Sequence, residues 1–270
     1  PETPLMVFTF SRAHAVVKLD PALLDLCLII ADQGAACAGV YTQNLVVAAP
    51  VTLSRAHLAA SPRARAVVVN SGNANACTGE SGARHAAQVA ARVADLTSSP
   101  DAPVTSSEVQ VASTGVIGSP LPVDVILNAL DGLKERCGPD QLPRFAASIM
   151  TTDNRPKARA LELDLTGVEG AAGVARVTIS GCSKGAGMIH PNMATMLGYV
   201  VTDAVVAAPL LQTLTQSAVQ TSFNRITVDG DTSTNDAVVV AATGASGVVV
   251  AEEEPARLAR FEAALKDLCL

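Results

Sequence analysis

Short apolar runs, many of them β-branched, alternate along the chain with Ala-rich stretches in which apolar residues recur every three or four positions. Continuous apolar runs are typical of strands that are covered on both faces of a sheet. The three-to-four spacing is typical of helices that bury one side. The expected strands are Ala66–Asn70, Val109–Ser113, Ala175–Ser180, Leu197–Thr202 and Ala237–Val240.

The helical spacing occurs in four places, and the last of the four helices has the clearest start. Three glutamates and Pro255 precede its apolar stripe, and acidic residues and proline are favoured in a first helical turn. The first of the four is expected to begin near Ser81, because serine is a good helix cap. The apolar positions are Val89, Val93 and Leu96; Ile126, Leu130 and Leu133; Leu211, Leu214 and Ala218; and Leu258, Phe261, Leu265 and Leu268.

No internal repeat and no long Pro-, Gly- or Ser-rich linker divides the 270 residues. A chain of this length can bury a sizeable core. Hydrophobic residues make up 49% and charged residues 16%, which excludes a disordered or fibrous protein. We therefore expect one α/β domain over residues 1–270, with layered mixed sheets flanked by helices.

Charge and hydropathy exclude two classes of partner. The net charge is −6 and the 19 Lys and Arg residues are scattered, whereas nucleic-acid binding needs a basic surface. The longest uncharged run, Ala237–Ala251, is too short to span a bilayer. The N-terminus has no secretory signal pattern, so a cytoplasmic protein is expected. Because the chain begins at Pro1 without Met, an organelle stays open if a transit peptide was removed.

The cysteines and the acidic residues do not form a recognisable metal or disulfide pattern. The six cysteines contain no CxxC pair, so free thiols in a reducing compartment are expected. Cys77 and Cys182 lie in Gly-rich segments, but a buried cysteine is most often only a small apolar residue. Residues 229–236 resemble a calcium loop, yet Val240 stands where the closing glutamate belongs. We therefore expect a polar structural loop and no metal.

The most distinctive segment, residues 184–197, is KGAGMIHPNMATML. A Gly-rich turn that leads into a buried strand can hold a small nucleophile close to a substrate. Taken singly, Thr195 would be an ordinary strand residue and Lys184 a solvated charge. His190 could serve Thr195 as a base, although a turn residue before Pro191 is its commoner role.

Together with SGNANACTG at 71–79 and STGVIG at 113–118, this segment resembles the bifunctional glutamate/ornithine N-acetyltransferases. The resemblance implies an N-terminal-nucleophile-like fold of the aminopeptidase/ornithine acetyltransferase type. It also implies that the chain cuts itself between Ala194 and Thr195. The cut would separate an α part, 1–194, from the start of a β part, 195–270, and the subunits would form a heterotetramer. Because relatives continue through a further C-terminal region, we expect the N-terminal part of such an enzyme.

The same resemblance assigns roles to individual residues. Thr195 is the expected nucleophile, and Thr114 and Gly115 are the expected oxyanion hole. Thr151, Lys184 and Thr195 are the expected substrate-binding residues, without a cofactor. A lysine suits a substrate carboxylate because it supplies a positive charge and three donors. The freed α-amine of Thr195, whose ordinary pKa is about 7.7–8.0, can take the hydroxyl proton.

The function that the resemblance implies is transfer of acetyl from N2-acetyl-L-ornithine to L-glutamate through an acetyl-threonine intermediate, in arginine biosynthesis. Some members of the family also accept acetyl-CoA, and the sequence leaves this substrate open. It also leaves open a paralogue of secondary metabolism. Two other classes of protein stay possible at this point: an N-terminal-nucleophile aminopeptidase or amidase, and a catalytically incomplete fragment.

Overall fold

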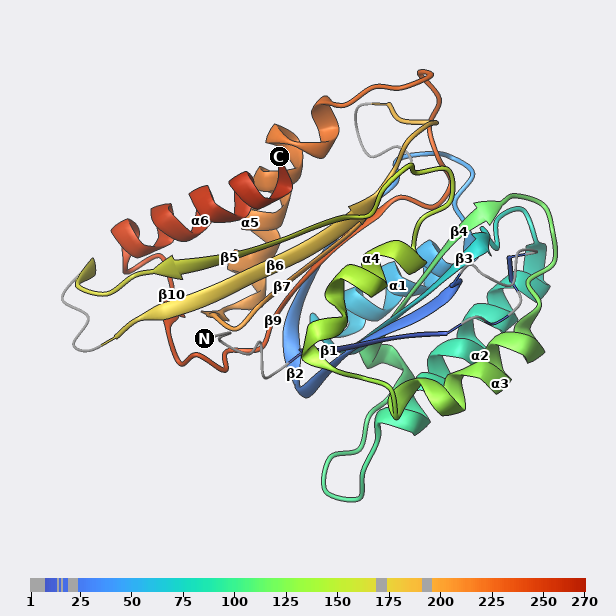
Figure 1. The fold of residues 1–270 in the computed structure, drawn as a ribbon, viewed down its shortest axis with the longest axis horizontal. Helices are drawn as coiled ribbons and strands as arrows, with labels where there is room; N and C mark the ends of the chain where they lie inside the picture. The colour runs from blue at the N-terminus through green and yellow to red at the C-terminus, as the bar shows by residue number, and fades with distance from the viewer. Residues whose placement is uncertain (1–7, 14, 16, 19–23, 169–173, 191–195) are drawn as a thin grey trace.

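The structure, a computed structural model, describes residues 8–13, 15, 17–18, 24–168, 174–190 and 196–270. Helices and strands alternate along most of the chain (Figure 1). The strands are β1 (Phe8–Ala13), β2 (Leu26–Tyr41), β3 (Arg63–Asn73), β4 (Val109–Val116), β5 (Lys157–Asp164), β6 (Arg176–Lys184), β7 (Leu197–Thr202), β8 (Val205–Val206), β9 (Ala237–Ala242) and β10 (Val249–Val250). The helices are α1 (Ala49–Ala60), α2 (Gly79–Thr97), α3 (Val123–Lys134), α4 (Leu142–Ser148), α5 (Ala208–Thr221) and α6 (Pro255–Cys269).

Within the described residues, eight strands form one mixed sheet. Seven of them follow the order β4-β3-β2-β9-β7-β6-β5, and β1 pairs with β2 beside this path. The pairs β3–β4 and β7–β9 are parallel, and the remaining neighbours in this sheet are antiparallel. The order is not the order along the chain, because β9 lies between β2 and β7.

The long strand β2 joins the two halves of the sheet. Its first part pairs with β3, its last part pairs with β9, and the register with β3 shifts between Ile30 and Ala35. A register irregularity of this kind bends a strand and increases its twist. The inner faces of both halves therefore contribute to one apolar cluster, which includes Ile29 and Val67 from one half and Tyr199 and Val239 from the other.

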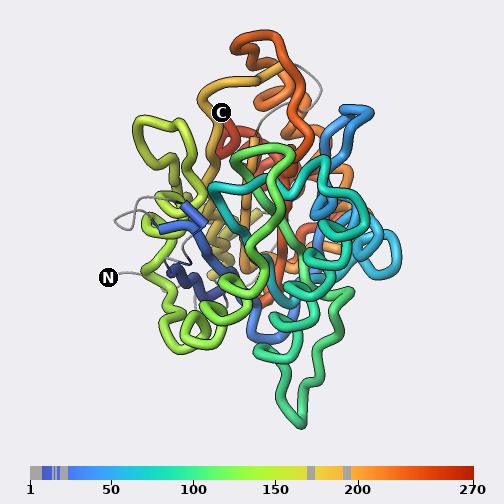
Figure 2. Tube along the Cα trace, turned by 90° about the vertical axis from the view of Figure 1, so that its right-hand side faces the viewer, coloured from blue at the N-terminus to red at the C-terminus, as the bar shows by residue number. Residues whose placement is uncertain are grey.

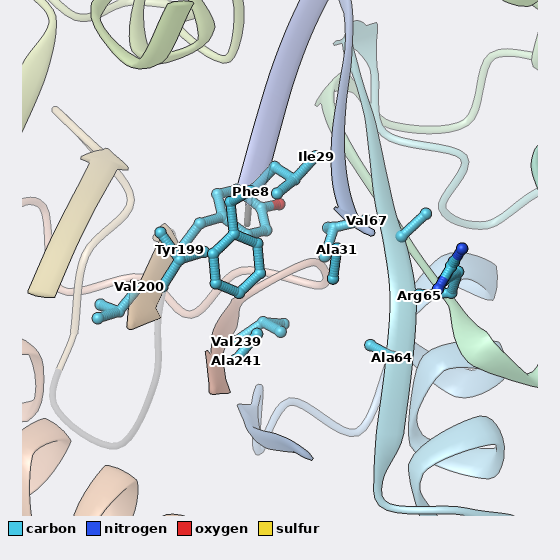
Figure 3. A pocket seen from close by; sticks show the side chains of 12 residues that line it. Phe8, Ile29, Ala31, Ala64, Arg65, Val67, Tyr199, Val200, Val239 and Ala241 are labelled. Carbon is cyan, nitrogen blue, oxygen red and sulfur yellow. The ribbon is translucent and has the colours of Figure 1, made fainter. Parts of the chain in front are cut away.

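Figure 3 shows side chains of both halves around a narrow apolar pocket inside this cluster, among them Phe8, Ala31, Tyr199 and Ala241. Phe145 of α4 closes the cluster by edge-to-face contacts. Its ring centroid lies 5.9 Å from that of Phe10 and 5.6 Å from that of Tyr199. Contacts of this geometry add to the stabilisation that burial alone provides.

Helices cover the outer faces of the sheet. The helix α2 packs on β3 and β4, and α3 packs on β1 and β2. On the other half of the sheet, α5 packs on β2 and β9, and α6 packs on β5 and β6 (Figure 1). The turn after α2 projects from the body of the molecule (Figure 2). The result is a layered mixed α/β fold, as expected from the sequence. No helix in the described part of the chain has both the length and the hydropathy needed to cross a membrane.

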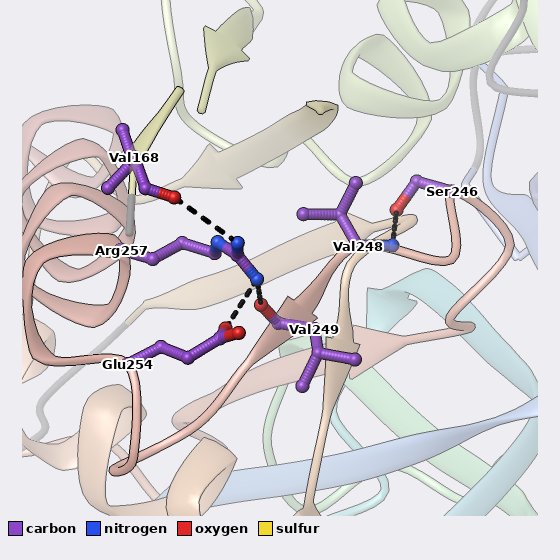
Figure 4. A network of polar contacts seen from close by, with 6 residues as sticks. All are labelled: Val168, Ser246, Val248, Val249, Glu254 and Arg257. Carbon is purple, nitrogen blue, oxygen red and sulfur yellow. Dashed lines mark hydrogen bonds and ion pairs between the residues drawn. The ribbon is translucent and has the colours of Figure 1, made fainter. Parts of the chain in front are cut away.

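A buried arginine fixes the start of α6. Arg257 donates hydrogen bonds to the carbonyl oxygens of Val249, at 2.9 Å, and Val168, at 3.4 Å, and pairs with Glu254 (Figure 4). The helix begins at Pro255, so the predicted start is confirmed. The cluster joins α6 to β10 and to the segment after β5.

All five expected strands occur, and the expected helices also occur. The predicted start of α2 at Ser81 is wrong, because the helix begins at Gly79. Ser81 already lies in the first turn, where its hydroxyl donates to the carbonyl oxygen of Thr78 at 2.8 Å. The sequence analysis did not predict β1, β2 and β5, nor α1 and α4.

Candidate active site

A pocket of about 560 Å³ lies where β3, β4 and β6 end. It brings together four residues that the sequence singled out at widely separated positions: Thr114, Gly115, Thr151 and Lys184. Further residues line it that the sequence analysis did not assign to the site. These are Lys18, Gly72, Ala74, Val116, Ile117, Thr152, Gly187, Met188, Ser233, Thr234 and Asn235.

The predicted nucleophile and cleavage site, Thr195 and Ala194, lie outside the residues that the structure describes. The chain that follows them is described. Leu197 opens β7 directly opposite Lys184 of β6, and the backbone N–H of Met196 donates to Asp236 at 2.7 Å. The described chain after the predicted nucleophile therefore starts beside a residue that lines the pocket.

The ends of β3 and β4 approach each other closely because both carry glycine. Gly72 pairs with Gly115, and both have a positive φ, +108° and +133°. A Cβ on Gly115 would lie 2.3 Å from the carbonyl carbon of Gly72, a distance that no side chain could tolerate. Glycine thus allows bare backbone to line the pocket beside Thr114, as an oxyanion hole requires.

Asn235 ties this strand end to the loop that follows β3. Its side-chain amide donates to the carbonyl oxygens of Ala74, at 2.6 Å, and Ser113, at 2.9 Å. The hydroxyl of Thr234 donates to the Asn235 oxygen at 2.5 Å, so the amide orientation is fixed. The loop at 229–236 was expected to be polar and structural; the structure adds that residues 233–235 of this loop also line the pocket.

A chain of asparagine side chains holds the loop after β3. Asn70 accepts from the Ser113 hydroxyl at 2.6 Å and donates to the carbonyl oxygen of Asn73 at 2.8 Å. Asn75, with a φ of +46°, donates to the carbonyl oxygen of Gly82 in α2 at 2.9 Å. Asparagine tolerates this left-handed backbone better than most residues, which explains the Asn-rich composition of the segment.

Lys184 is buried, with only 4% of its surface exposed. Burial lowers its pKa, and the nearby carboxylates of Asp153 and Asp236 act in the opposite direction. A cation that has lost most of its water binds a carboxylate more strongly than an exposed lysine does. The position therefore suits recognition of a carboxylate in the pocket.

Asp153 is the nearby acid that has direct contacts with the turn after β6. It accepts from the backbone N–H of Gly185 at 2.9 Å and from the ammonium of Lys157. Burial acts to raise the pKa of Asp153, but these hydrogen bonds and the charges of Lys157 and Lys184 outweigh it and lower the pKa overall. Asp153 is thus an ionised anchor for the turn that carries Lys184.

The other candidate nucleophiles and bases lie in less suitable places. His190 is exposed, and Ile189 before it forms a backbone bridge with Val228 at 2.7 Å in both directions. Cys182 is buried, which raises the pKa of its thiol, and Cys77 is exposed but does not line the pocket. Within the described ranges, no group of three or more His, Cys, Asp or Glu residues is placed to hold a metal ion.

Comparison with known proteins places the chain among enzymes of one family. A family model described as the ArgJ family matches residues 9–270. The arginine biosynthesis bifunctional protein ArgJ of Geobacter sulfurreducens is 47% identical over 263 residues, which cover 97% of this chain and 63% of that protein. The chain thus spans about three fifths of the length of the curated relatives that it matches.

Solved structures also resemble this chain. The crystal structure of the arginine biosynthesis bifunctional protein ArgJ from Bacillus halodurans has a TM-score of 0.61 at 36% identity, and the match covers 70% of this chain and 91% of that one. Ornithine acetyltransferase from Mycobacterium tuberculosis, complexed with ornithine, has a TM-score of 0.57 at 32% identity, with 70% and 93% covered. An aminopeptidase from Ochrobactrum anthropi, a variant of the Ntn hydrolase fold, has a TM-score of 0.50 at 10% identity. The expected N-terminal-nucleophile-like fold is therefore confirmed.

Proposed function

The chain belongs to the ArgJ family, and we propose that it transfers an acetyl group from N2-acetyl-L-ornithine to L-glutamate in arginine biosynthesis. The observation that supports this best is the pocket that gathers Thr114, Gly115, Thr151 and Lys184. These four residues come from three separate segments of the chain, and each has a chemical role in the transfer.

The proposed first half-reaction acetylates the protein. The Thr195 hydroxyl oxygen attacks the acetyl carbonyl while the freed Thr195 amine takes the hydroxyl proton. Donors at Thr114 and Gly115 stabilise the oxyanion. The proton then passes to the departing α-amine as the C–N bond breaks, which releases ornithine and leaves acetyl-Thr195. Lys184 and Thr151 hold the substrate during this step.

The second half-reaction is the same chemistry in reverse with another amine. The neutral α-amine of glutamate attacks the ester carbonyl of acetyl-Thr195. The oxyanion forms again at Thr114 and Gly115, the threonine oxygen leaves with a proton, and N-acetylglutamate is released. An aminopeptidase or amidase would use water here instead. The identity with ArgJ proteins favours the transferase over that hydrolase.

Formation of the N-terminal threonine requires a cut between Ala194 and Thr195, and we propose that the protein makes it. The fold explains how the pieces would stay together. The strands β7 and β9 of the second piece lie between β2 and β6 of the first piece, so backbone hydrogen bonds join them on both sides. The proposed assembly is a heterotetramer of the two subunits.

The six cysteines are all free thiols, which suits a reducing compartment, and we place the protein in the cytoplasm. Acetyl-CoA is a further candidate acetyl donor, because its thioester carries an activated acetyl group.

The test uses the purified protein with N2-acetylornithine, with and without glutamate. We expect N-acetylglutamate only when glutamate is present, and a mass increase of one acetyl group on the piece that begins with Thr195 when it is absent. Thr195→Ala should stop both cleavage and transfer, whereas Thr195→Ser should retain part of each because the hydroxyl and the amine survive. Release of free acetate at the same rate with and without glutamate would favour the hydrolase.

A further inference from the structure

A second lysine lines the same pocket. Lys18 stands in the connection between β1 and β2, more than 160 residues from Lys184 along the chain. Its side chain is partly buried, and its ammonium donates to the carbonyl oxygens of Leu24, at 2.8 Å, and Ser148, at 3.5 Å. An ammonium has three donors, and these two contacts leave one N–H for a ligand within the described part of the chain.

A buried carboxylate holds the backbone of Lys18 in place. Asp25 has no exposed surface, and it accepts from the backbone N–H groups of Ala15, of Val17 at 2.7 Å and of Lys18 itself at 2.9 Å. The carbonyl oxygen of Asp25 accepts from the Ser71 backbone at 2.8 Å. The segment that carries Lys18 is therefore fixed to the end of β3.

The stem of Lys18 lies against Gly72, next to the expected oxyanion hole. A Cβ on Gly72 would approach Cγ of Lys18 and the carbonyl oxygen of Val17 to 3.0 Å each. Gly72 is in turn the pairing partner of Gly115. Lys18 thus reaches the pocket from the side of β3 and β4, whereas Lys184 reaches it from the end of β6.

The described residues that line the pocket include two lysines and no acid. The acids close to these lysines have other partners. Asp25 accepts from the backbone of Ala15, Val17 and Lys18. Asp236 accepts from the backbone of Met196, and Asp153 accepts from the backbone of Gly185 and from the ammonium of Lys157. The charge that the pocket presents to a ligand is therefore positive at two separate points. Such a pocket favours a ligand that carries two anionic groups.

Of the two amino acids in the proposed reaction, only glutamate has two anionic groups. Its amine must be neutral to attack the acetyl-enzyme, so the reactive form is a dianion. N2-acetylornithine carries one carboxylate and one ammonium, so its net charge is zero. Building on the proposed function, we propose that Lys18 is a specificity-determining residue that binds the second carboxylate of the glutamate acceptor, while Lys184 binds the first.

The kinetic test compares both substrates in Lys18→Met, Lys18→Gln and Lys18→Arg. Removing a charged partner of a carboxylate typically weakens binding by about tenfold to a hundredfold. In Lys18→Met and Lys18→Gln, the Michaelis constant for glutamate should rise at least about tenfold more than that for N2-acetylornithine. Lys18→Arg should recover part of the glutamate affinity. The exposed Lys134 provides the control, Lys134→Met.

If Lys18 only held the fold together through its two hydrogen bonds to carbonyl oxygens, the kinetic result would differ. Lys18→Gln keeps a donor for the two carbonyl oxygens without the charge, so it separates binding from folding if Lys18→Met is unstable. Equal rises in the Michaelis constants of both substrates, or full activity of Lys18→Gln, would overturn the inference.

A binding measurement that needs no turnover separates this inference from the proposed function. Calorimetric titration of the purified protein with glutarate and with 5-aminovalerate compares a dicarboxylate with a similar chain that ends in an ammonium. The wild-type protein should bind glutarate more tightly, and Lys18→Gln should lose this preference. An equal preference in both proteins would refute the role of Lys18. Loss of the preference in Lys18→Gln, when the wild type transfers no acetyl group, would refute the proposed function but uphold dicarboxylate binding by Lys18.

Discussion

The Asp236 carboxylate accepts a hydrogen bond of 2.7 Å from the backbone N–H of Met196. Met196 directly follows the predicted nucleophile in the sequence, and Asp236 is only 1% exposed. Asp236 also precedes β9, which pairs in parallel with β7. One buried carboxylate therefore fixes the backbone N–H of Met196 relative to a central strand.

Asp236 should act as a positioning residue for self-cleavage. Asp236→Ala removes the acceptor, and loss of a hydrogen bond to a charged group, about 1.5–3 kcal/mol, should slow cleavage by about tenfold to a hundredfold. Asp236→Asn keeps an acceptor oxygen and should cleave at an intermediate rate. The appearance of the two pieces over time, followed by mass spectrometry, measures this. The exposed Asp231 of the same loop gives the control Asp231→Ala; equal rates in all variants would contradict the role.

Gly115→Ala should distort the junction of β3 and β4. The new Cβ would lie 2.3 Å from the carbonyl carbon of Gly72, and the φ of +133° is unfavourable for alanine. Backbone strain alone costs about 1–3 kcal/mol, and the clash adds to it. Gly118→Ala is the matched control, because Gly118 has a φ of +82° but open space around its Cα. Urea unfolding should show the larger loss for Gly115→Ala, together with a loss of turnover that Gly118→Ala does not share.

Asn235→Ala should weaken both the fold and the pocket. The change leaves the carbonyl oxygens of Ala74 and Ser113 without their buried donor, which costs about 1–3 kcal/mol each. The control is Asn44→Ala, because Asn44 makes its hydrogen bonds to Thr232 at the exposed surface. Chemical denaturation should separate the two variants by more than about 1 kcal/mol. Similar midpoints for both would show that the buried amide contributes little.

Asp153→Asn should destabilise the protein in a pH-dependent way. The pKa of Asp153 is lowered in the folded protein, so its carboxylate stabilises the fold above the ordinary value of about 3.9. The stabilisation is lost as the pH falls through the lowered pKa. The variant should therefore be less stable than the wild type at pH 7, by about 1.5–3 kcal/mol, and the difference should shrink below pH 4. Thermal unfolding across this range tests it; a constant difference would contradict the ionic role.

The sequence predicted the parts of the fold whose signal is local. The continuous apolar runs of β7 and β9 and the three-to-four spacing of α6 are examples. The strand β2 was missed because Asp32, Gln33 and Gly34 interrupt its apolar pattern at the place where its register with β3 shifts. That strand is stabilised by two different neighbours, β3 and β9, which no local pattern reveals.

The site residues also fall into those that the sequence identified and those that it did not. The resemblance identified Thr114, Gly115, Thr151 and Lys184, because short motifs carry them, and the structure brings these four to one pocket. It did not identify Lys18, Asn235 or Asp236. Lys18 and Asn235 contact residues more than 100 positions away. Asp236 bonds to Met196, and these two residues directly precede the paired strands β9 and β7. The Asn235 signal was present in the polar loop at 229–236, but its composition suggested only a structural role.

The place of β7 and β9 inside the sheet has a consequence for how the protein can recover from denaturation. An uncut chain folds from one molecule, so its folding rate is independent of concentration. After a cut before Thr195, the two central strands belong to a different molecule from β2 and β6 on either side. Refolding then requires an encounter between two chains and competes with aggregation of exposed strand edges. The cut protein would therefore persist through slow unfolding rather than through reversible equilibrium.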